Sequence, residues 1–298
     1  MTTELTILDD AEVRRRLAAT GAPAAVAAMR DALVAFHRGE LEAPPRVDAV
    51  LTFTAGRRIG HWFGFRSYAR PVLGQQVVAL HRESDGVLIA LALGSALGDH
   101  RTGALGGAAV DALARRDAKT LGIIGTGRQA WTQVWAIAGI RALAEVTVHS
   151  RDPERRAAFA ARITAELGVP ARPDSDAAAA VRDRDIAVVA TSSRSPVVEG
   201  SWFSPGTAVT TLGPKQIGAA EFGPDLPAVA SVVVTDSPPQ LAAFDPPAVL
   251  AGASVTSLGA VLAGDAPGRT SDDDITLYES VGLAGTEPWL LAHLLDHP

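Results

Sequence analysis

The stretch KTLGIIGTGRQA, Lys119–Ala130, decides the fold. A short apolar run leads into Gly125, Thr126 and Gly127, and a helix-prone segment follows; in this strand–turn–helix setting a GxGxx(G/A) pattern indicates a dinucleotide site. Gly125 permits a tight turn, and Gly127 leaves room for a pyrophosphate because it has no Cβ. The free N–H groups and the dipole of the following helix favour phosphate. We assign the phosphates to this turn and to the first helical residues, Arg128 and Gln129.

The next predicted strand, Glu145–His149, arrives at the spacing of a dinucleotide site, which argues against an ordinary strand–turn–helix with incidental glycines. NAD-preferring sites carry an acidic residue at this strand end, about 20 residues beyond the glycines, for the ribose 2′-OH. Here Ser150 and Arg151 follow the strand, and a guanidinium with a hydroxyl suits a 2′-phosphate. Asp152 is predicted instead to cap the next helix. The sequence therefore predicts NADP(H); a solvated loop arginine at position 151 is the alternative.

The composition describes a globular chain with an acidic balance. Its 298 residues are 47% hydrophobic and 20% charged, which allows one large or two medium domains. The net charge of −6 argues against nucleic acid or an anionic membrane as a partner. The absence of cysteine excludes disulfides and thiolate chemistry, and no HExxH spacing suggests a metal site. Without an apolar run of transmembrane length or a recognisable signal peptide, we expect a cytoplasmic protein.

The order of predicted elements divides the chain. About 95 residues at the start predict an α+β unit on a mainly antiparallel sheet, with a strand at 6–8 and helices at 11–20, after Asp9 and Asp10, and 22–38. From Thr120 onward apolar runs alternate with helix-prone segments such as 153–167 and 175–184, which predicts an α/β, doubly wound parallel sheet with ligand at the C-terminal strand ends. Its strands are expected at 121–124, 145–149, 169–172, 186–190, 208–212 and 232–235. Thr191 and Ser192 follow the fourth of these strands, and we assign them to the cofactor.

A glycine-rich segment, Ser95–Arg116, connects the two parts. We read it as a turn followed by a helix, with Arg101 and Thr102 where the helix begins. A cation at a helix N-terminus opposes the dipole, so its presence there indicates an anionic ligand. An incidental surface arginine is the alternative.

Five segments, in order, resemble the ornithine cyclodeaminase/μ-crystallin family: APPR around Arg46, HRTGA around Arg101, GIIGTGRQA, VHSRD and GRTSDDDITLYESVG. The resemblance spans nearly the whole chain. It implies a homodimer in which residues 1–117 with 286–298 form the substrate pocket and dimer contact, and residues 118–285 form a Rossmann-type NADP-binding domain. Family members include amino-acid cyclodeaminases, ketimine reductases and alanine- or opine-type dehydrogenases. They share hydride transfer between a nicotinamide and the α-carbon of an amino or imino acid.

The resemblance also implies site residues. The carboxylate-binding arginines of the family fall on Arg46 and Arg101, and a forked guanidinium binds a planar carboxylate bidentately. The active-site lysine of the family falls on Arg66, a departure, because arginine side chains keep a pKa above about 12 and do not shuttle protons as lysine does. Thr102 matches a pyrophosphate contact. The loop beside the nicotinamide matches Ser280, Val281 and Gly282.

A second departure concerns proton transfer. Where the cyclodeaminases carry an Asp after the fifth Rossmann strand, this chain has Lys215. A cation does not accept an ammonium proton as a carboxylate does, which argues against ornithine cyclodeamination. A lysine could protonate an imine nitrogen or pair with a substrate carboxylate, and a surface lysine is the alternative. His100 adjoins Arg101 and is a further possible general acid, with a structural histidine as the alternative.

Together these observations predict an NADPH-dependent reductase of a C=N bond beside a carboxylate. The substrate would be a cyclic ketimine, or an imine formed from a 2-oxo acid and an amine, held by Arg46, Arg101 and Arg66. Two alternatives stay open. One is an amino-acid cyclodeaminase, which would need a base in place of the missing Asp. The other is a binding protein that uses NADPH to order a pocket, as the μ-crystallin resemblance permits.

Overall fold

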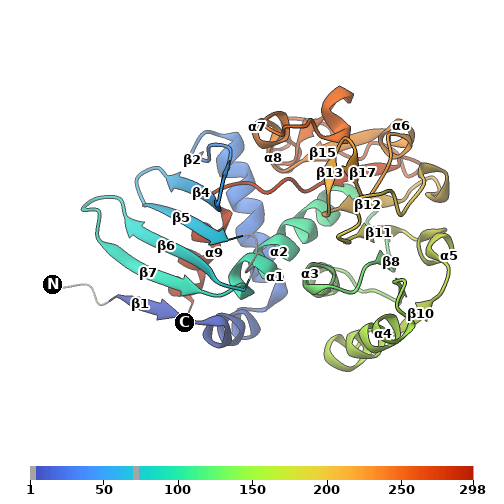
Figure 1. The fold of residues 1–298 in the computed structure, drawn as a ribbon, viewed down its shortest axis with the longest axis horizontal. Helices are drawn as coiled ribbons and strands as arrows, with labels where there is room; N and C mark the ends of the chain where they lie inside the picture. The colour runs from blue at the N-terminus through green and yellow to red at the C-terminus, as the bar shows by residue number, and fades with distance from the viewer. Residues whose placement is uncertain (1–4, 70–73, 298) are drawn as a thin grey trace.

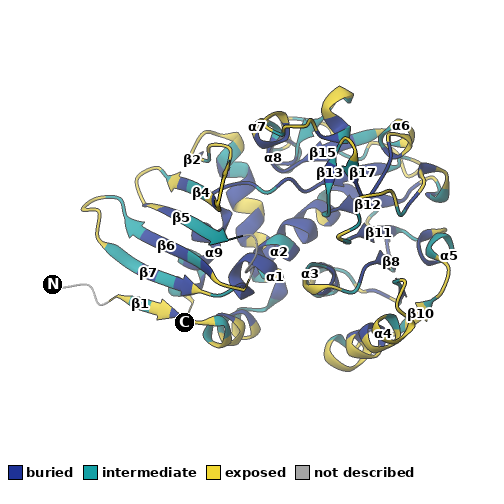
Figure 2. Ribbon diagram, viewed as in Figure 1, coloured by how far each residue is buried: buried dark blue, intermediate teal, exposed yellow. Residues whose placement is uncertain are grey.

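Two sheets lie side by side in the computed structural model, with helices between them (Figure 1). The structure describes residues 5–69 and 74–297; residues 1–4, 70–73 and 298 of the predicted first domain lie outside the described residues. The central strands of the second sheet are buried, whereas much of the first sheet's surface is partly or fully exposed (Figure 2). The predicted division at 117/118 and 285/286 stays a prediction.

The first sheet is mainly antiparallel, as predicted. Its strand order is β1-β7-β6-β5-β4-β2, with β3 paired to β4, and β1 alone among the described strands of this sheet pairs in parallel, with β7. The strands are β1 (Thr6–Leu8), β2 (Leu41–Glu42), β3 (Val47–Asp48), β4 (Leu51–Arg58), β5 (Trp62–Ala69), β6 (Gln76–Arg82) and β7 (Leu88–Leu93).

Helix α1 (Asp10–His37) consists of two helical segments that meet at Gly21, which agrees with the two helices predicted on either side of that residue. Gly21 itself is not helical: its φ of +79° and ψ of 162° break the helix and produce a kink between the two segments, a conformation that glycine adopts readily. Asp9 alone caps it; the Asp10 carboxylate instead accepts a hydrogen bond from Ala96 N. By length and composition α1 is apolar enough to cross a membrane, but residues such as Met29 and Leu33 are fully buried in the core.

Helix α2 (Ala96–Leu113) differs from its prediction. The glycine-rich segment is helical from its start rather than a turn, and its glycines serve packing. An added Cβ at Gly103 or Gly106 would overlap Thr132 or Gln133 of α3 (Arg128–Ile140), so these glycines allow the two helices to approach closely. Arg101 therefore lies in the second turn of α2, and the dipole argument does not apply to it.

The second sheet is parallel and doubly wound, which confirms the predicted fold class. Its order is β10-β9-β8-β11-β12-β17-β15-β16, so the winding reverses between β8 and β11. The strand-like run near the C-terminus becomes β17, between β12 and β15. The strands are β8 (Thr120–Ile124), β9 (Glu145–His149), β10 (Ala171–Asp174), β11 (Ile186–Val189), β12 (Ala208–Thr211), β15 (Val232–Thr235), β16 (Thr256–Ser257) and β17 (Thr276–Glu279).

Helices cover both faces of this sheet. The helix at 153–167 is confirmed as α4, capped by Asp152, whereas the helix predicted at 175–184 is only α5 (Ala177–Val181). It ends early because Arg182 is extended and Asp183 has a positive φ of 56°. The remaining short elements are β13 (Lys215–Gln216), β14 (Ala219–Ala220), α6 (Asp225–Val229), α7 (Pro238–Ala242) and α8 (Leu258–Ala263), and the C-terminal helix is α9 (Thr286–Asp296). Helix α9 packs against α1, β5 and β6 of the first half.

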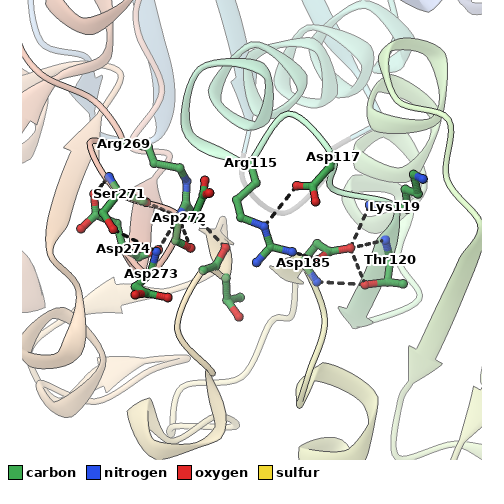
Figure 3. A network of polar contacts seen from close by, with 12 residues as sticks. Arg115, Asp117, Lys119, Thr120, Asp185, Arg269, Ser271, Asp272, Asp273 and Asp274 are labelled. Atoms are coloured by element: carbon green, nitrogen blue, oxygen red, sulfur yellow. Dashed lines mark hydrogen bonds and ion pairs between the residues drawn. The ribbon is translucent and has the colours of Figure 1, made fainter.

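A polar network joins the N-terminal ends of several strands, away from the glycine turn (Figure 3). Asp185, before β11, accepts hydrogen bonds from the side chain of Arg115. It also accepts from the backbone N–H groups of Lys119 and Thr120, where β8 begins. Arg269 donates to the carbonyls of Leu113, Gly206 and Asp274, at 2.7, 3.0 and 2.6 Å. These contacts fix the end of α2 against the sheet, and α2 carries the residues that face the site.

Candidate functional site

The glycine turn has the geometry that an anion site requires. Gly125 has a φ of +117°, and an added Cβ would overlap the carbonyl oxygen of Ala190. Gly127 is the N-cap of α3 with no side-chain hydrogen bond, and no atom lies within 4 Å of where its Cβ would be. The N–H groups of the first turn of α3 are thus left for an anionic ligand. This turn fits the pyrophosphate of a dinucleotide.

A cavity of about 1170 Å³ lies over this turn. It is large for a small-molecule site and follows the C-terminal ends of β8, β9, β11 and β12, beside the point where the winding reverses. One wall comes from the first half of the chain, through Arg66, Tyr68, Gln76 and Asp99. The cavity therefore spans the two sheets.

Ten of the predicted site residues line this cavity: Arg66, Gly125, Thr126, Gly127, Arg128, Gln129, Ser150, Arg151, Thr191 and Ser192. Among the described residues, seven others do not reach its walls: Arg46, His100, Arg101, Thr102, Lys215, Val281 and Gly282. Nine of the twelve predicted cofactor-binding residues thus lie together, whereas Thr102, Val281, Gly282 and most of the predicted substrate-binding and catalytic residues do not line the cavity.

The end of the cavity beyond β9 carries the residues that were assigned to a 2′-phosphate. Arg151 is exposed there, and no described residue forms an ion pair or hydrogen bond with its side chain. Ser150 donates its hydroxyl to Asp152 O at 3.0 Å, and the Asp152 carboxylate accepts from two N–H groups of α4. Arg155 adds a second cation to this end of the cavity. The Arg151 guanidinium is thus free among the described residues, whereas the Asp152 carboxylate is occupied.

Arg66 lies on the opposite wall and is held from two sides. Its Nε and Nη2 donate to Gln76 Oε1 at 3.0 and 2.7 Å, and its Nη1 donates to Glu287 Oε1 at 2.6 Å. Its guanidinium also lies 4.4 Å from the ring centre of Tyr68. These contacts fix the guanidinium plane where it faces the cavity, a suitable arrangement for a carboxylate.

Arg101 also binds the carboxylate of Glu287 but does not itself line the cavity. It is 5% exposed, and its Nη2 is hydrogen-bonded to Glu287 Oε1. Burial raises the pKa of Glu287, but the guanidinium groups of Arg101 and Arg66 outweigh burial and hold that pKa below its ordinary value. The carboxylate is therefore ionised and links the two arginines, so that Arg101 supports Arg66.

Arg46 lies beside the loop that follows β17. Its Nε pairs with Asp48 Oδ2 at 2.8 Å, and its Nη1 donates to Val281 O at 3.3 Å. The other side of that loop is held by Asp236, which accepts from Val281 N and Gly282 N at 2.8 and 3.0 Å. The loop predicted to lie beside the nicotinamide is thus fixed from both sides.

Lys215 is buried in the short strand β13, which follows β12. Its Nζ donates to Leu212 O at 3.2 Å and to Ser280 O at 2.5 Å, which joins the loops after β12 and β17. Burial lowers the pKa of Lys215, and the carboxylates of Glu279, Glu221 and Asp236 oppose that effect. The surface-lysine alternative is therefore wrong.

Two buried glutamates accompany Lys215. The Glu221 carboxylate is fully buried and accepts four hydrogen bonds, from Thr191 N, Thr191 Oγ1, Leu212 N and Gly213 N. Glu279 is also fully buried, but neither carboxylate oxygen has a hydrogen-bond partner among the described residues. Burial raises the pKa of Glu279 to about 7.

His100 and Thr102 have local partners on α2. His100 Nδ1 lies 2.8 Å from Ala96 O, its ring meets the Trp135 ring edge to face, and burial lowers its pKa. Thr102 donates its hydroxyl to Gly98 O at 2.9 Å. Both side chains thus form contacts within and beside the helix.

Several residues that the structure brings to the site were not predicted from the sequence. Tyr68, Gln76, Asp99 and Arg155 line the cavity, and Glu221, Asp236 and Glu287 lie behind it. The only signal in the sequence was an isolated acidic residue in apolar surroundings, as at Glu221 in AAEFG and Glu287 in TEPWLL. A buried carboxylate needs partners, so such a residue indicates a polar network.

The fold and cavity define a class: a two-sheet protein with a dinucleotide-type glycine turn facing a fixed guanidinium. The family model of the ornithine cyclodeaminase/mu-crystallin family matches residues 12–288, and the chain belongs to this family. This confirms the predicted resemblance.

Relatives agree with this assignment. The Delta(1)-pyrroline-2-carboxylate reductase of Bacillus cereus is 37% identical over 218 residues, which cover 70% of this chain and 66% of the reductase. The match thus spans just under two thirds of that enzyme's length.

Solved structures share the fold over the whole chain. An archaeal alanine dehydrogenase dimer with bound NAD is 25% identical, with a TM-score of 0.84 over 98% of this chain and 95% of that one. The reductase of Thermococcus litoralis, solved with NADH and L-proline, has a TM-score of 0.87 over 98% of this chain and 97% of that one, at 24% identity. At that identity the second comparison shows the fold alone.

Proposed function

We propose that the protein is an NADPH-dependent reductase of imines that carry a carboxylate. The observation that carries this proposal is that the glycine turn before α3 and the guanidinium of Arg66 line the same cavity. A cofactor lying along the strand ends would have its nicotinamide end toward that guanidinium. The named activities of relatives, Delta(1)-pyrroline-2-carboxylate reductase and iminosuccinate reductase, support an imino acid as substrate.

The chain's own residues would bind and orient the reactants. The cofactor supplies the hydride when bound, and orientation is most of what the protein adds. Arg66 would bind the substrate carboxylate, and Glu287 with Arg101 would hold Arg66 in place. Arg46 and Lys215 would fix the loops after β12 and β17, and Lys215 stays our candidate proton donor to the imine nitrogen.

NADPH rather than NADH is proposed on the free guanidinium of Arg151. The neighbours solved with NADH or NAD support a nicotinamide dinucleotide in general. The 2′-phosphate would pair with Arg151, which a bare ribose would leave without an anion, whereas Arg155 already pairs with Asp152 Oδ2 at 3.4 Å.

A homodimer is proposed on the outer face of the first sheet. Exposed apolar side chains from three strands gather there, on β4 (Leu51 and Phe53), β5 (Phe63) and β7 (Leu93). Apolar patches of this kind mark protein contacts. Light scattering of the purified protein tests this proposal, and a monomer at micromolar concentration contradicts it.

Absorbance of NADPH at 340 nm tests the function. The purified protein is given NADPH with Δ1-pyrroline-2-carboxylate, other cyclic imino acids, and pairs of a 2-oxo acid with an amine. We expect oxidation of NADPH with at least one imino acid. Tight NADPH binding with no oxidation by any of them would favour a binding protein, and release of ammonia from L-ornithine with NADP⁺ would favour a cyclodeaminase.

A further inference from the structure

Asp99 lies on the cavity wall beside Arg66. It belongs to the first turn of α2, and its side chain is only 11% exposed. A Cβ added to the preceding residue, Gly98, would lie 3.1 Å from both Arg66 Nη2 and Gln76 Oε1. The Arg66–Gln76 pair therefore packs directly on the helical turn that carries Asp99.

The partners of Asp99 place it where the two ends of the cavity meet. Gln129 Nε2 donates to its Oδ1 at 2.9 Å, and Arg128 Nε lies 3.4 Å from its Oδ2; both belong to the first turn of α3. Burial raises the pKa of Asp99, opposed by Arg128, Ser95, His100 and Arg66. These are the charged and polar groups that face it from α2, α3 and β5.

Among the described residues that line the cavity, the carboxylates are Asp99 and Asp152. Asp152 caps α4 at the 2′-phosphate end and is occupied by N–H groups of that helix. Asp99 is thus the carboxylate on the wall that also carries Arg66.

An imino acid has its carboxylate and its nitrogen on the same carbon. A site that binds the carboxylate with a guanidinium therefore has a second place, a few ångströms away, for the nitrogen. A carboxylate at that place stabilises a protonated nitrogen and raises its pKa, because opposite charges favour the ionised form. That proton speeds hydride transfer, because protonation of the nitrogen makes the imine carbon far more electrophilic.

We propose that Asp99 is the counter-charge of the substrate nitrogen and selects imino and amino acids over other carboxylates. This inference rests on the proposed function. In the reduction, hydride from NADPH bonds to the imine carbon, and the electron pair of the C=N bond moves to the nitrogen, which keeps its proton. NADPH becomes NADP⁺, and the amine then takes a second proton from solvent. Asp99 stays ionised throughout.

Asp99→Asn tests the assignment, because it removes the charge and keeps the shape. The matched control is Asp111→Asn, an exposed aspartate on the same helix outside the cavity. We expect Asp99→Asn to lower kcat/KM for the imino acid by about 10–150-fold, the loss of one charge-assisted contact, while the Kd for NADPH changes less than threefold. Activity on the corresponding 2-oxo acid, which has no nitrogen, should change little. The alkaline limb of the kcat profile should move to lower pH, because the bound iminium loses its proton more easily.

Two results would overturn the assignment. One is unchanged kcat/KM and pH profile in Asp99→Asn. The other is a weakened Kd for NADPH with kcat unchanged, which would make Asp99 a positioning residue for Arg128. If the wild type reduces no imino acid, the proposed function fails, and binding still tests Asp99. The NADP⁺ complex of the wild type should then bind L-proline at least tenfold more tightly than cyclopentanecarboxylate, and Asp99→Asn should bind both alike. Equal affinity in the wild type contradicts the role of Asp99.

Discussion

Replacing Glu221 with glutamine should both destabilise the protein and weaken cofactor binding. The carboxylate receives two N–H or O–H donors on each oxygen, at 2.8 and 2.8 Å on Oε2 and at 3.0 and 2.5 Å on Oε1. An amide keeps one acceptor oxygen and turns an NH₂ group toward the other two donors. Two charge-assisted hydrogen bonds of about 1.5–3 kcal/mol each are lost, or roughly 3–6 kcal/mol.

Part of this loss is offset. Burial raises the pKa of Glu221, so the ionised carboxylate is costly to bury and a neutral amide is less so. We therefore expect a net loss of about 2–5 kcal/mol of unfolding free energy, which lowers Tm by roughly 5–15 °C. The donors Thr191, Leu212 and Gly213 all line the cavity, so their displacement should weaken NADPH at least tenfold.

Differential scanning fluorimetry and a fluorescence titration with NADPH measure the two effects. Glu199→Gln is the matched control, because Glu199 is exposed and a surface substitution of this kind changes stability by less than about 0.5 kcal/mol. An unchanged Tm and an unchanged Kd for NADPH in Glu221→Gln would refute the role of Glu221 in shaping the cavity.

Four further predictions follow from the site. Arg151→Ala should weaken NADPH by roughly 10–150-fold and NADH hardly at all, and equal affinity of the wild type for both cofactors contradicts the 2′-phosphate site. Gly125→Ala should abolish cofactor binding in a titration, because its Cβ would overlap the Ala190 carbonyl, and retained affinity refutes the turn geometry. Lys215→Met should lower kcat by about 10²–10⁴ if the lysine donates the proton, whereas full kcat removes it from that role. Glu279 has a raised pKa of about 7, so its protonated form favours folding at low pH and the benefit is lost as pH rises from about 4.5 to 7. Denaturant titrations should show wild type losing up to roughly 3 kcal/mol against Glu279→Gln across that window, and parallel pH curves would contradict it.

The cofactor half could be predicted from the sequence because its signals are local. The turn at Gly125, the strand before it and the cap at Asp152 each depend on a few consecutive residues, and parallel strands bring their C-terminal ends to one edge whatever the loops contain. The structural role of a glycine could not be predicted where it depends on packing against a neighbouring helix. At Gly103 and Gly106 the glycines serve the packing of α3 on α2, which no window of sequence displays.

The substrate half could not be predicted to the same depth. Arg66 was found through family resemblance, but its fixed orientation depends on Gln76 and Glu287, which lie 10 and 221 residues away along the chain. Arg101 was expected on the substrate and instead lies behind Arg66. Asp99 adjoins the expected residues in sequence, but only the fold shows that it faces the cavity. Such roles arise from contacts between distant segments.

Transfer of deuterium tests the central claim most directly. The purified protein is given NADPH that carries deuterium at C4 of the nicotinamide, in each of the two stereochemical forms, together with Δ1-pyrroline-2-carboxylate, and the amino acid formed is analysed by mass spectrometry. Reduction of the imine by direct hydride transfer predicts one deuterium on the α-carbon of proline from one of the two forms. Proline formed without deuterium from either form would contradict it, and if this imine is not reduced, the same outcome is decided with the imino acid that does oxidise NADPH.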